Sequence, residues 1–155
     1  MDVSSRIRII ETPFAPGDEL AQFQAKAAGA GAIVSFSGLV RAADADRTVL
    51  GLDLQHFPGF TEKRIAAFCE TALQRWPLQD LTIVHRVGAM VPGEPIVFVA
   101  TAAAHRRAAF EAADYLMDYL KSEAPFWKKE RREDGDVWIE PGAEDKRDKS
   151  RWDKA

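Results

Sequence analysis

The strongest constraint in this 155-residue sequence is an apolar stripe between residues 61 and 76. Its members recur at the i, i+3, i+4, i+7, i+8 and i+11 spacing of one helix face: Ile65, Phe68, Cys69, Ala72, Leu73 and Trp76. Pro77 follows at once, and proline cannot continue a helix. A helix with one apolar face must bury that face against another layer of the fold, so the chain is expected to build a packed core.

The rest of the chain mixes strand and helix patterns. A second long helix is predicted from His105 to Glu123, where Pro125 follows, and a short one opens at Pro16 and ends at Gly29–Gly31. Alternation or β-rich composition predicts strands over residues 5–12, 32–40, 50–56, 81–88, 96–103 and 137–140. We expect strand 32–40 to be buried and strands 81–88 and 96–103 to pair with each other. Residues 133–136 carry a hairpin signal. Because these elements show no regular βαβ alternation, the predicted fold class is α+β, a mixed or antiparallel sheet with packed helices.

The length and composition favour one domain with a distinct end. The hydrophobic fraction is 46%, the charged fraction 29% and the net charge −3, which is an ordinary globular balance. We expect a single catalytic domain over residues 1–140. Residues 141–155 form a charge-dense C-terminal tail in which Trp152 is the only large apolar residue, so we expect this tail to be loosely held or ordered by a partner.

Composition also excludes several classes of site. One cysteine, Cys69, forms no intramolecular disulfide, and His56, His85 and His105 lack metal-ligand spacing. The acidic balance argues against a nucleic-acid coat, and no apolar run is long enough for a membrane span. We therefore expect a soluble, cytoplasmic protein with no metal, no nucleic-acid partner and no membrane partner.

Cationic residues stand at the ends of the predicted elements. Arg41 follows a strand that contains Gly38, whose missing side chain lets a ligand approach the backbone. His105 and Arg106 stand at a helix N-terminus, a favourable place for a bound anion. Lys121 closes that helix, and the Pro125 break lets the chain fold back and bring Lys128 to the same pocket.

Each of these features also has a structural interpretation. Arg41 after a strand is usually solvated, and Lys121 near a helix C-terminus is explained by the helix dipole. His85 alternates with apolar residues and is typical of a satisfied core histidine, while Cys69 within the stripe is typical of a small buried hydrophobe. These residues alone indicate an anion-binding α+β domain and specify no reaction.

Several motifs, taken together and in order, resemble the molybdopterin synthase catalytic (large) subunit family. They run from about Ala32 to Trp138, with a weaker match at Arg151–Trp152, and comprise SGLVR at 37–41, HFPGFTEK at 56–63, HRVG at 85–88, PGE at 92–94, AHR at 104–106, DYLK at 118–121 and PFWKKE at 125–130. The resemblance implies an α/β-hammerhead-like α+β domain. It also implies sulfur transfer to cyclic pyranopterin monophosphate (precursor Z), which forms the molybdopterin dithiolene.

The resemblance further implies partners and residue roles. The sulfur donor is the C-terminal thiocarboxylate of a small ubiquitin-like subunit, and the chain is a homodimer within a heterotetramer with no cofactor of its own. Lys121 and Lys128 become the catalytic amines, and the substrate-binding residues become Leu39, Val40, Arg41, His105, Arg106, Lys129 and Glu130. The alternative is a non-catalytic module that binds the partner's Gly-Gly tail, although such a scaffold needs neither lysine.

Overall fold

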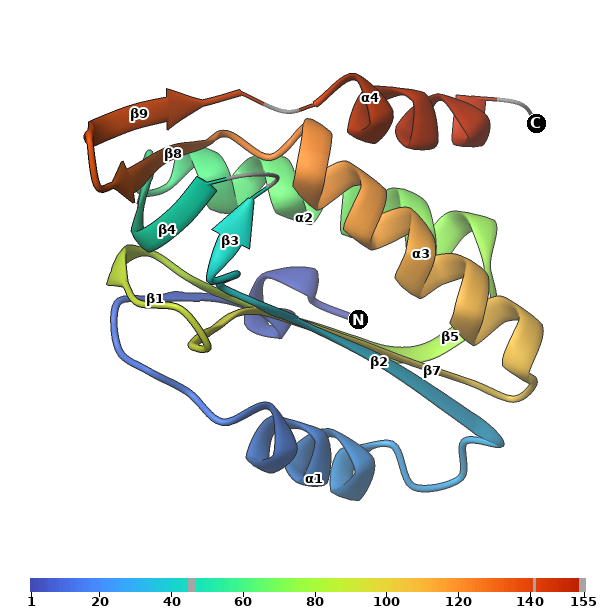
Figure 1. The fold of residues 1–155 in the computed structure, drawn as a ribbon. Helices are drawn as coiled ribbons and strands as arrows, with labels where there is room; N and C mark the ends of the chain where they lie inside the picture. The colour runs from blue at the N-terminus through green and yellow to red at the C-terminus, as the bar shows by residue number, and fades with distance from the viewer. Residues whose placement is uncertain (45–46, 141, 154–155) are drawn as a thin grey trace.

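The computed structural model describes residues 1–44, 47–140 and 142–153 and has the predicted α+β architecture (Figure 1). Its helices are α1 (Pro16–Lys26), α2 (Phe60–Arg75), α3 (Arg106–Ser122) and α4 (Ala143–Ser150). Its strands are β1 (Ile7–Ile10), β2 (Ala32–Leu39), β3 (Ala43–Asp44), β4 (Arg47–His56), β5 (Leu78–Arg86), β6 (Gly88–Met90), β7 (Pro95–Ala103), β8 (Phe126–Arg132) and β9 (Gly135–Ile139). Short 3-10 turns cover Val3–Arg6 and Arg151–Asp153.

The first sheet has the strand order β1-β5-β7-β2 and lies between two layers of helix (Figure 1). β5 and β7 pair antiparallel, as predicted, and β1 pairs parallel with β5. Alternate residues of β5 and β7 face opposite sides, so Ile83 and Val99 pack with α2 and α3 while Val84 and Phe98 pack with α1. Cys69 is fully buried in the α2–α3 layer, which confirms the structural interpretation of that residue.

The second sheet has the order β3-β4-β8-β9, with β6 paired to β4. The predicted hairpin is confirmed, since β8 pairs antiparallel with β9 and Arg132 lies opposite Gly135. A small apolar cluster joins this sheet to the first one and includes Val40, Leu54, Val87 and Met90, with Phe126 packed against it.

Three local predictions are wrong. The segment 32–40 was expected to be buried, but β2 is an edge strand, and Phe36 and Leu39 are exposed. The pattern 50–56 was expected to present one face, but a register shift between Val49 and Gly51 leaves Leu50 exposed while Leu52 and Leu54 stay buried. The polar segment 41–48, between two predicted strands, was expected to be a loop, but it contains β3 and the start of β4, which pair antiparallel; residues 45 and 46 lie outside the described residues.

The C-terminal segment also departs from its prediction. Residues 143–150 form α4, which packs against α3 (Figure 1). Trp152 makes edge contacts with Trp76 and Tyr115. The expectation of a loosely held tail overlooked that one tryptophan and a set of ion pairs suffice to anchor a short polar helix. Among the described helices, none is long and apolar enough to cross a membrane.

Candidate active site

The two predicted catalytic lysines flank a sharp reversal of the chain. Lys121 lies in the last turn of α3, which ends where Glu123 and Ala124 donate their backbone N–H groups to the Tyr119 carbonyl oxygen, at 2.7 and 3.1 Å. After Pro125 the chain enters β8, which carries Lys128. The predicted fold-back after the Pro125 break is therefore present.

Thr61 fixes this reversal from the side of α2. The Thr61 hydroxyl is fully buried, accepts a hydrogen bond from the Phe57 backbone N–H at 3.0 Å and donates one to the Pro125 carbonyl oxygen at 3.2 Å. One side chain thus ties the turn before α2 to the turn before β8. Because β8 also pairs with β4, where Leu54 lies opposite Lys128, the backbone of Lys128 is held from two directions.

Lys128 is the more perturbed of the two amines. Burial lowers the pKa of Lys128, and the positive charges of Lys121 and then Arg41 lower it further, while Asp145 and Glu130 oppose the shift. The electrostatic coupling places Lys121, Lys128 and Arg41 in one cationic cluster. Repulsion between ammonium groups is only the second cause, because removal of the Lys128 ammonium from water contributes more.

A buried histidine lies beside this cluster. The His85 ring stacks on Phe126 with 4.0 Å between ring centroids and 17° between planes. Its Nδ1 lies 3.0 Å from the Arg86 carbonyl oxygen, and because a carbonyl only accepts, Nδ1 carries the proton. Burial lowers the pKa of His85 to about 4. The hydrogen bond with Arg86 opposes this shift, and the positive charges of Lys121 and Lys128 make a smaller contribution in the same direction as burial. His85 is therefore a neutral, satisfied core histidine, as predicted.

Lys129 and Glu130, which follow Lys128 in β8, are each engaged in an internal contact. Successive β8 residues face opposite sides, so Lys129 projects from the other face of the strand and its Nζ lies 5.4 Å from the Trp138 ring centroid. Glu130 is buried, and its carboxylate accepts a hydrogen bond from Arg132 Nε at 2.7 Å. Lys129 thus makes a cation–π contact and Glu130 an internal ion pair.

At the end of β2, one residue is exposed to solvent and the next is packed in the core. Leu39 is exposed and Val40 is buried, with the Val40 N–H donating to the Glu94 carbonyl oxygen at 2.9 Å. The predicted role of Gly38 in admitting a ligand has a competing explanation, because an added Cβ would lie 2.7 Å from Val97 Cγ1. Glycine at residue 38 is thus required by the contact between β2 and β7.

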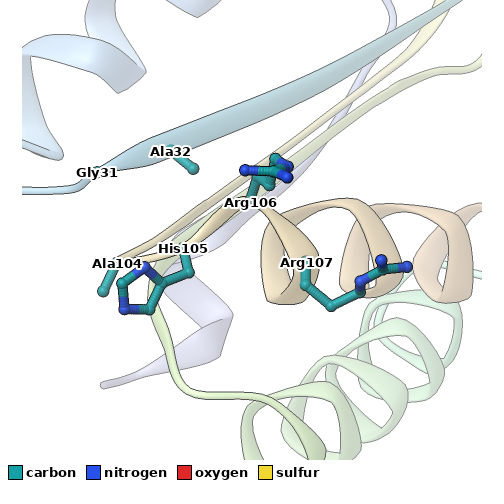
Figure 2. A pocket seen from close by; sticks show the side chains of 6 residues that line it. All are labelled: Gly31, Ala32, Ala104, His105, Arg106 and Arg107. Atoms are coloured by element: carbon teal, nitrogen blue, oxygen red, sulfur yellow. The ribbon is translucent and has the colours of Figure 1, made fainter.

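His105 and Arg106 lie at the opposite end of α3 from the lysines. They border a shallow pocket of about 370 Å³ with four neighbours: Gly31, Ala32, Ala104 and Arg107 (Figure 2). Figure 2 shows the side chains of His105, Arg106 and Arg107 diverging. Because 16 residues of helix separate His105 from Lys121, the two ends are about 24 Å apart at 1.5 Å per residue. One chain therefore does not bring these residues to the lysine cluster.

Sequence reasoning missed two contributors to the site. Asp145 of α4 acts electrostatically on Lys128, although it belongs to the segment expected to be loosely held. His85 was recognised as a core residue, but its place against Phe126, two residues before Lys128, had no sequence signal. Both depend on contacts between segments far apart in the chain.

Comparison with known proteins decides the family. The model of the MoaE protein family matches residues 9–123. The chain belongs to the MoaE family. The molybdopterin synthase catalytic subunit of Caulobacter vibrioides is 52% identical over 96% of this chain and 97% of its own, and that of Escherichia coli is 43% identical over 96% and 98%.

Solved structures agree with this assignment. A MoaE protein from Burkholderia ambifaria superposes with a TM-score of 0.81 at 42% identity, covering 96% of this chain and 98% of its own. A molybdopterin synthase crystal structure from Staphylococcus aureus has a TM-score of 0.78 at 28% identity, covering 86% and 96%. The predicted fold class is confirmed, and the chain is an enzyme, a sulfurtransferase subunit of molybdenum cofactor biosynthesis.

Proposed function

We propose that Lys121 and Lys128 are the catalytic amines of a reaction that moves sulfur from a protein thiocarboxylate to cyclic pyranopterin monophosphate. The observation that carries this proposal is the partly buried amine of Lys128 in one cationic cluster with Lys121 and Arg41. Burying a cation beside other cations is costly, and such an arrangement is typical of a site that binds anions or moves protons.

The charges fit the chemistry of this reaction. Both the cyclic phosphate of the substrate and the thiocarboxylate of the donor are anionic, so they repel one another unless cations screen them. Lys121 and Arg41 supply that charge at the protein surface. The lowered pKa of Lys128 brings this amine closer to neutral pH, where it both releases and accepts a proton more readily. Leu39 and Val40, which precede Arg41, are the apolar wall that we assign to the substrate pocket.

The position of His105 and Arg106 bears on the assembly. Since they lie about 24 Å from Lys121 along α3, they contact a substrate held at the lysines only if a second copy of the chain supplies them. We therefore take these two residues as substrate contacts donated across the homodimer. Lys129 and Glu130, which face Trp138 and Arg132, serve in this proposal as flanking residues that hold β8.

The partner in this proposal is a small ubiquitin-like subunit whose C-terminal Gly-Gly tail carries the thiocarboxylate. A complex of subunits 1 and 2 of molybdopterin-converting factor from Helicobacter pylori contains a chain with this fold, with a TM-score of 0.74 at 20% identity. Two copies of each subunit give the heterotetramer. The donated sulfur and the amines suffice for this scheme, so we propose no resident metal or cofactor, and we place the reaction in the cytoplasm on the sequence evidence.

The decisive experiment combines the purified chain, the thiocarboxylated partner and the cyclic substrate, and measures molybdopterin formed. Lys121→Ala and Lys128→Ala are each expected to lower the rate at least ~10²-fold, as for loss of a proton carrier. Lys26→Ala is the control, because this exposed lysine lies in the last turn of α1, on the opposite face of the first sheet from α3. Near-normal rates in both lysine variants would favour a non-catalytic module that only binds the partner's tail.

A further inference from the structure

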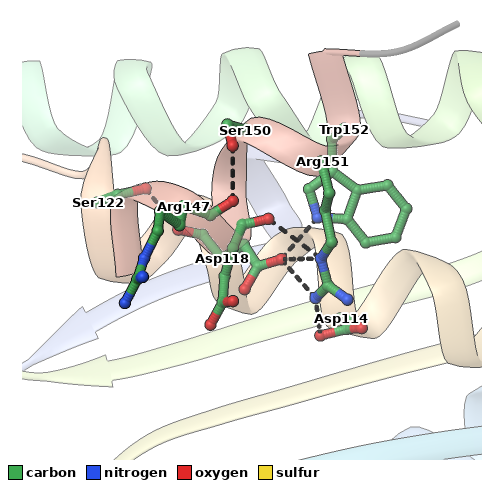
Figure 3. Close-up of polar contacts among 8 residues, drawn as sticks. Asp114, Asp118, Ser122, Arg147, Ser150, Arg151 and Trp152 are labelled. Atoms are coloured by element: carbon green, nitrogen blue, oxygen red, sulfur yellow. Dashed lines mark hydrogen bonds and ion pairs between the residues drawn. The ribbon is translucent and has the colours of Figure 1, made fainter. Parts of the chain in front are cut away.

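The segment from Ala143 to Asp153, which we call the C-terminal clamp, is attached to the protein by its far end. Its helix α4 has no buried residue. Much of the attachment comes from Arg151 and Trp152 in the 3-10 turn that follows, and both reach toward α3 (Figure 3). An ion pair between Lys149 of α4 and Glu123 adds to it, so these three side chains hold the segment against α3.

Both side chains converge on Asp118 of α3. The Asp118 Oδ2 atom accepts hydrogen bonds from Arg151 Nε at 3.1 Å, Arg151 Nη2 at 2.7 Å and the Trp152 indole N–H at 2.6 Å (Figure 3). Arg151 Nη2 also pairs with Asp114 Oδ1 at 2.7 Å, one helical turn earlier. The clamp therefore holds two successive turns of α3 through charge-assisted hydrogen bonds.

The helix alone does not account for a carboxylate at residue 118. The helix dipole disfavours a negative charge close to a helix C-terminus. Asp118 lies within the last turns of α3 and is largely buried, so its charge is compensated by the donors of the clamp. The clamp thus supplies the partners that this carboxylate needs near the end of α3.

The indole of Trp152 also packs against aromatic rings of the core. It makes edge contacts with Trp76 at 5.5 Å and Tyr115 at 5.6 Å between ring centroids. The Arg75 guanidinium lies against the same rings and donates to the Trp152 carbonyl oxygen at 2.7 Å. Trp152 thus joins α2 and α3 at one point.

The clamp holds α3 on both sides of Lys121. Asp118 precedes Lys121 by three residues, and Glu123 follows it by two. The Glu123 carboxylate pairs with Lys149 of α4 at 2.7 Å and with Arg64 of α2 at 3.3 Å. Helix ends fray readily, so a terminal turn that must present an amine accurately benefits from such external contacts.

We propose that Arg151 and Trp152 are positioning residues for Lys121, acting through Asp118 to order the last turn of α3. The proposal rests on the catalytic role proposed above for Lys121. It assigns the C-terminal segment a part in the turnover step without any contact with substrate.

The test compares Arg151→Ala and Trp152→Phe with Arg147→Ala in the assembled synthase. Trp152→Phe keeps an aromatic ring but removes the indole donor and part of the ring surface that contacts Trp76 and Tyr115. Arg147 is the control because its side chain extends away from Asp118, and the contact drawn for it is the one its carbonyl oxygen makes with the Ser150 hydroxyl (Figure 3). Steady-state kinetics separate kcat from KM for the pterin substrate, and amide hydrogen exchange reports the order of residues 119–124.

We expect Arg151→Ala to lower kcat about tenfold with KM unchanged within about twofold, because small displacements of a catalytic group cost up to 10²-fold in rate. Exchange at 119–124 rises in the same variant, Trp152→Phe shows a smaller effect of the same kind, and Arg151→Lys recovers part of the rate. Arg147→Ala behaves as the wild type.

Three results would overturn the proposal: unchanged kcat in both Arg151→Ala and Trp152→Phe, faster exchange at 119–124 without loss of kcat, or a rise in KM alone. Lys121→Ala is measured alongside them. Full activity in Lys121→Ala removes the role proposed for that lysine, whereas an inactive Lys121→Ala together with a fully active Arg151→Ala removes only the clamp.

Discussion

The buried neutral His85 makes the stability of this protein sensitive to mild acid. In the folded chain burial lowers the pKa of His85 from 6.5 to about 4, so the ring stays neutral where a histidine in the unfolded chain takes up a proton. Below pH 6.5 the unfolded state therefore binds more protons than the folded state. The contribution of His85 to the free energy of unfolding has its full value above pH 6.5 and decreases as the pH drops toward 4.

The magnitude follows from these two pKa values. A shift of this size corresponds to roughly 3 kcal/mol of stability lost once the pH has passed below both values, and about 2 kcal/mol of it is lost between pH 7 and pH 5. Lys121, Lys128 and His56 are the charged or titratable groups that act on His85. The carboxyl groups with lowered pKa values are Asp2, Glu94 and Glu123, and they contribute mainly at lower pH.

Urea unfolding followed by tryptophan fluorescence at pH 7, 6 and 5 measures this dependence. His85→Gln is expected to be less stable at pH 7, because it loses the stack on Phe126, but its free energy of unfolding should decline by about 2 kcal/mol less than that of the wild type between pH 7 and pH 5. His105→Gln is the control, because this histidine is exposed at the N-terminus of α3. An equal decline in His85→Gln and wild type would refute the reasoning.

Three further predictions concern other parts of the chain. Arg41→Ala and His105→Ala should each weaken binding of cyclic pyranopterin monophosphate by roughly 1.5–3 kcal/mol in calorimetric titration, with little effect on partner binding, as expected for charge-assisted contacts; unchanged affinity in both variants would remove them from the site. Gly38→Ala should lower the free energy of unfolding by about 1–3 kcal/mol, because its Cβ would lie 2.7 Å from Val97 Cγ1; an unchanged denaturation midpoint would contradict this. The Cys69 thiol, whose pKa burial raises to about 12, should react with iodoacetamide at pH 8 only as fast as the protein unfolds; rapid labelling of the native protein would show that the thiol is accessible.

Much of the fold follows from periodicity, which is a local property. The apolar stripe from Ile65 to Trp76 predicted α2, and the His105–Glu123 pattern predicted α3 within one residue at each end. The Glu133–Asp136 signal predicted the β8–β9 hairpin. Even the separation of His105 from Lys121 is implied by the predicted helix, because a helix of that length holds its two ends apart. The sequence interpretation listed both residues in one site without using this distance.

The remaining features depend on which segment lies against which. The partial burial of Lys128 requires β8 to pair with β4, and the exposure of Leu50 requires a register shift that alternation does not reveal. The polar sequence of α4 predicted a loose tail, yet Arg151 and Trp152 attach it to Asp118, 33 and 34 residues earlier in the chain. The sequence by itself determined the elements and the types of residue in the site. The tertiary structure decided the burial, the charge environment and the anchoring, because these arise from contacts between residues distant in the chain.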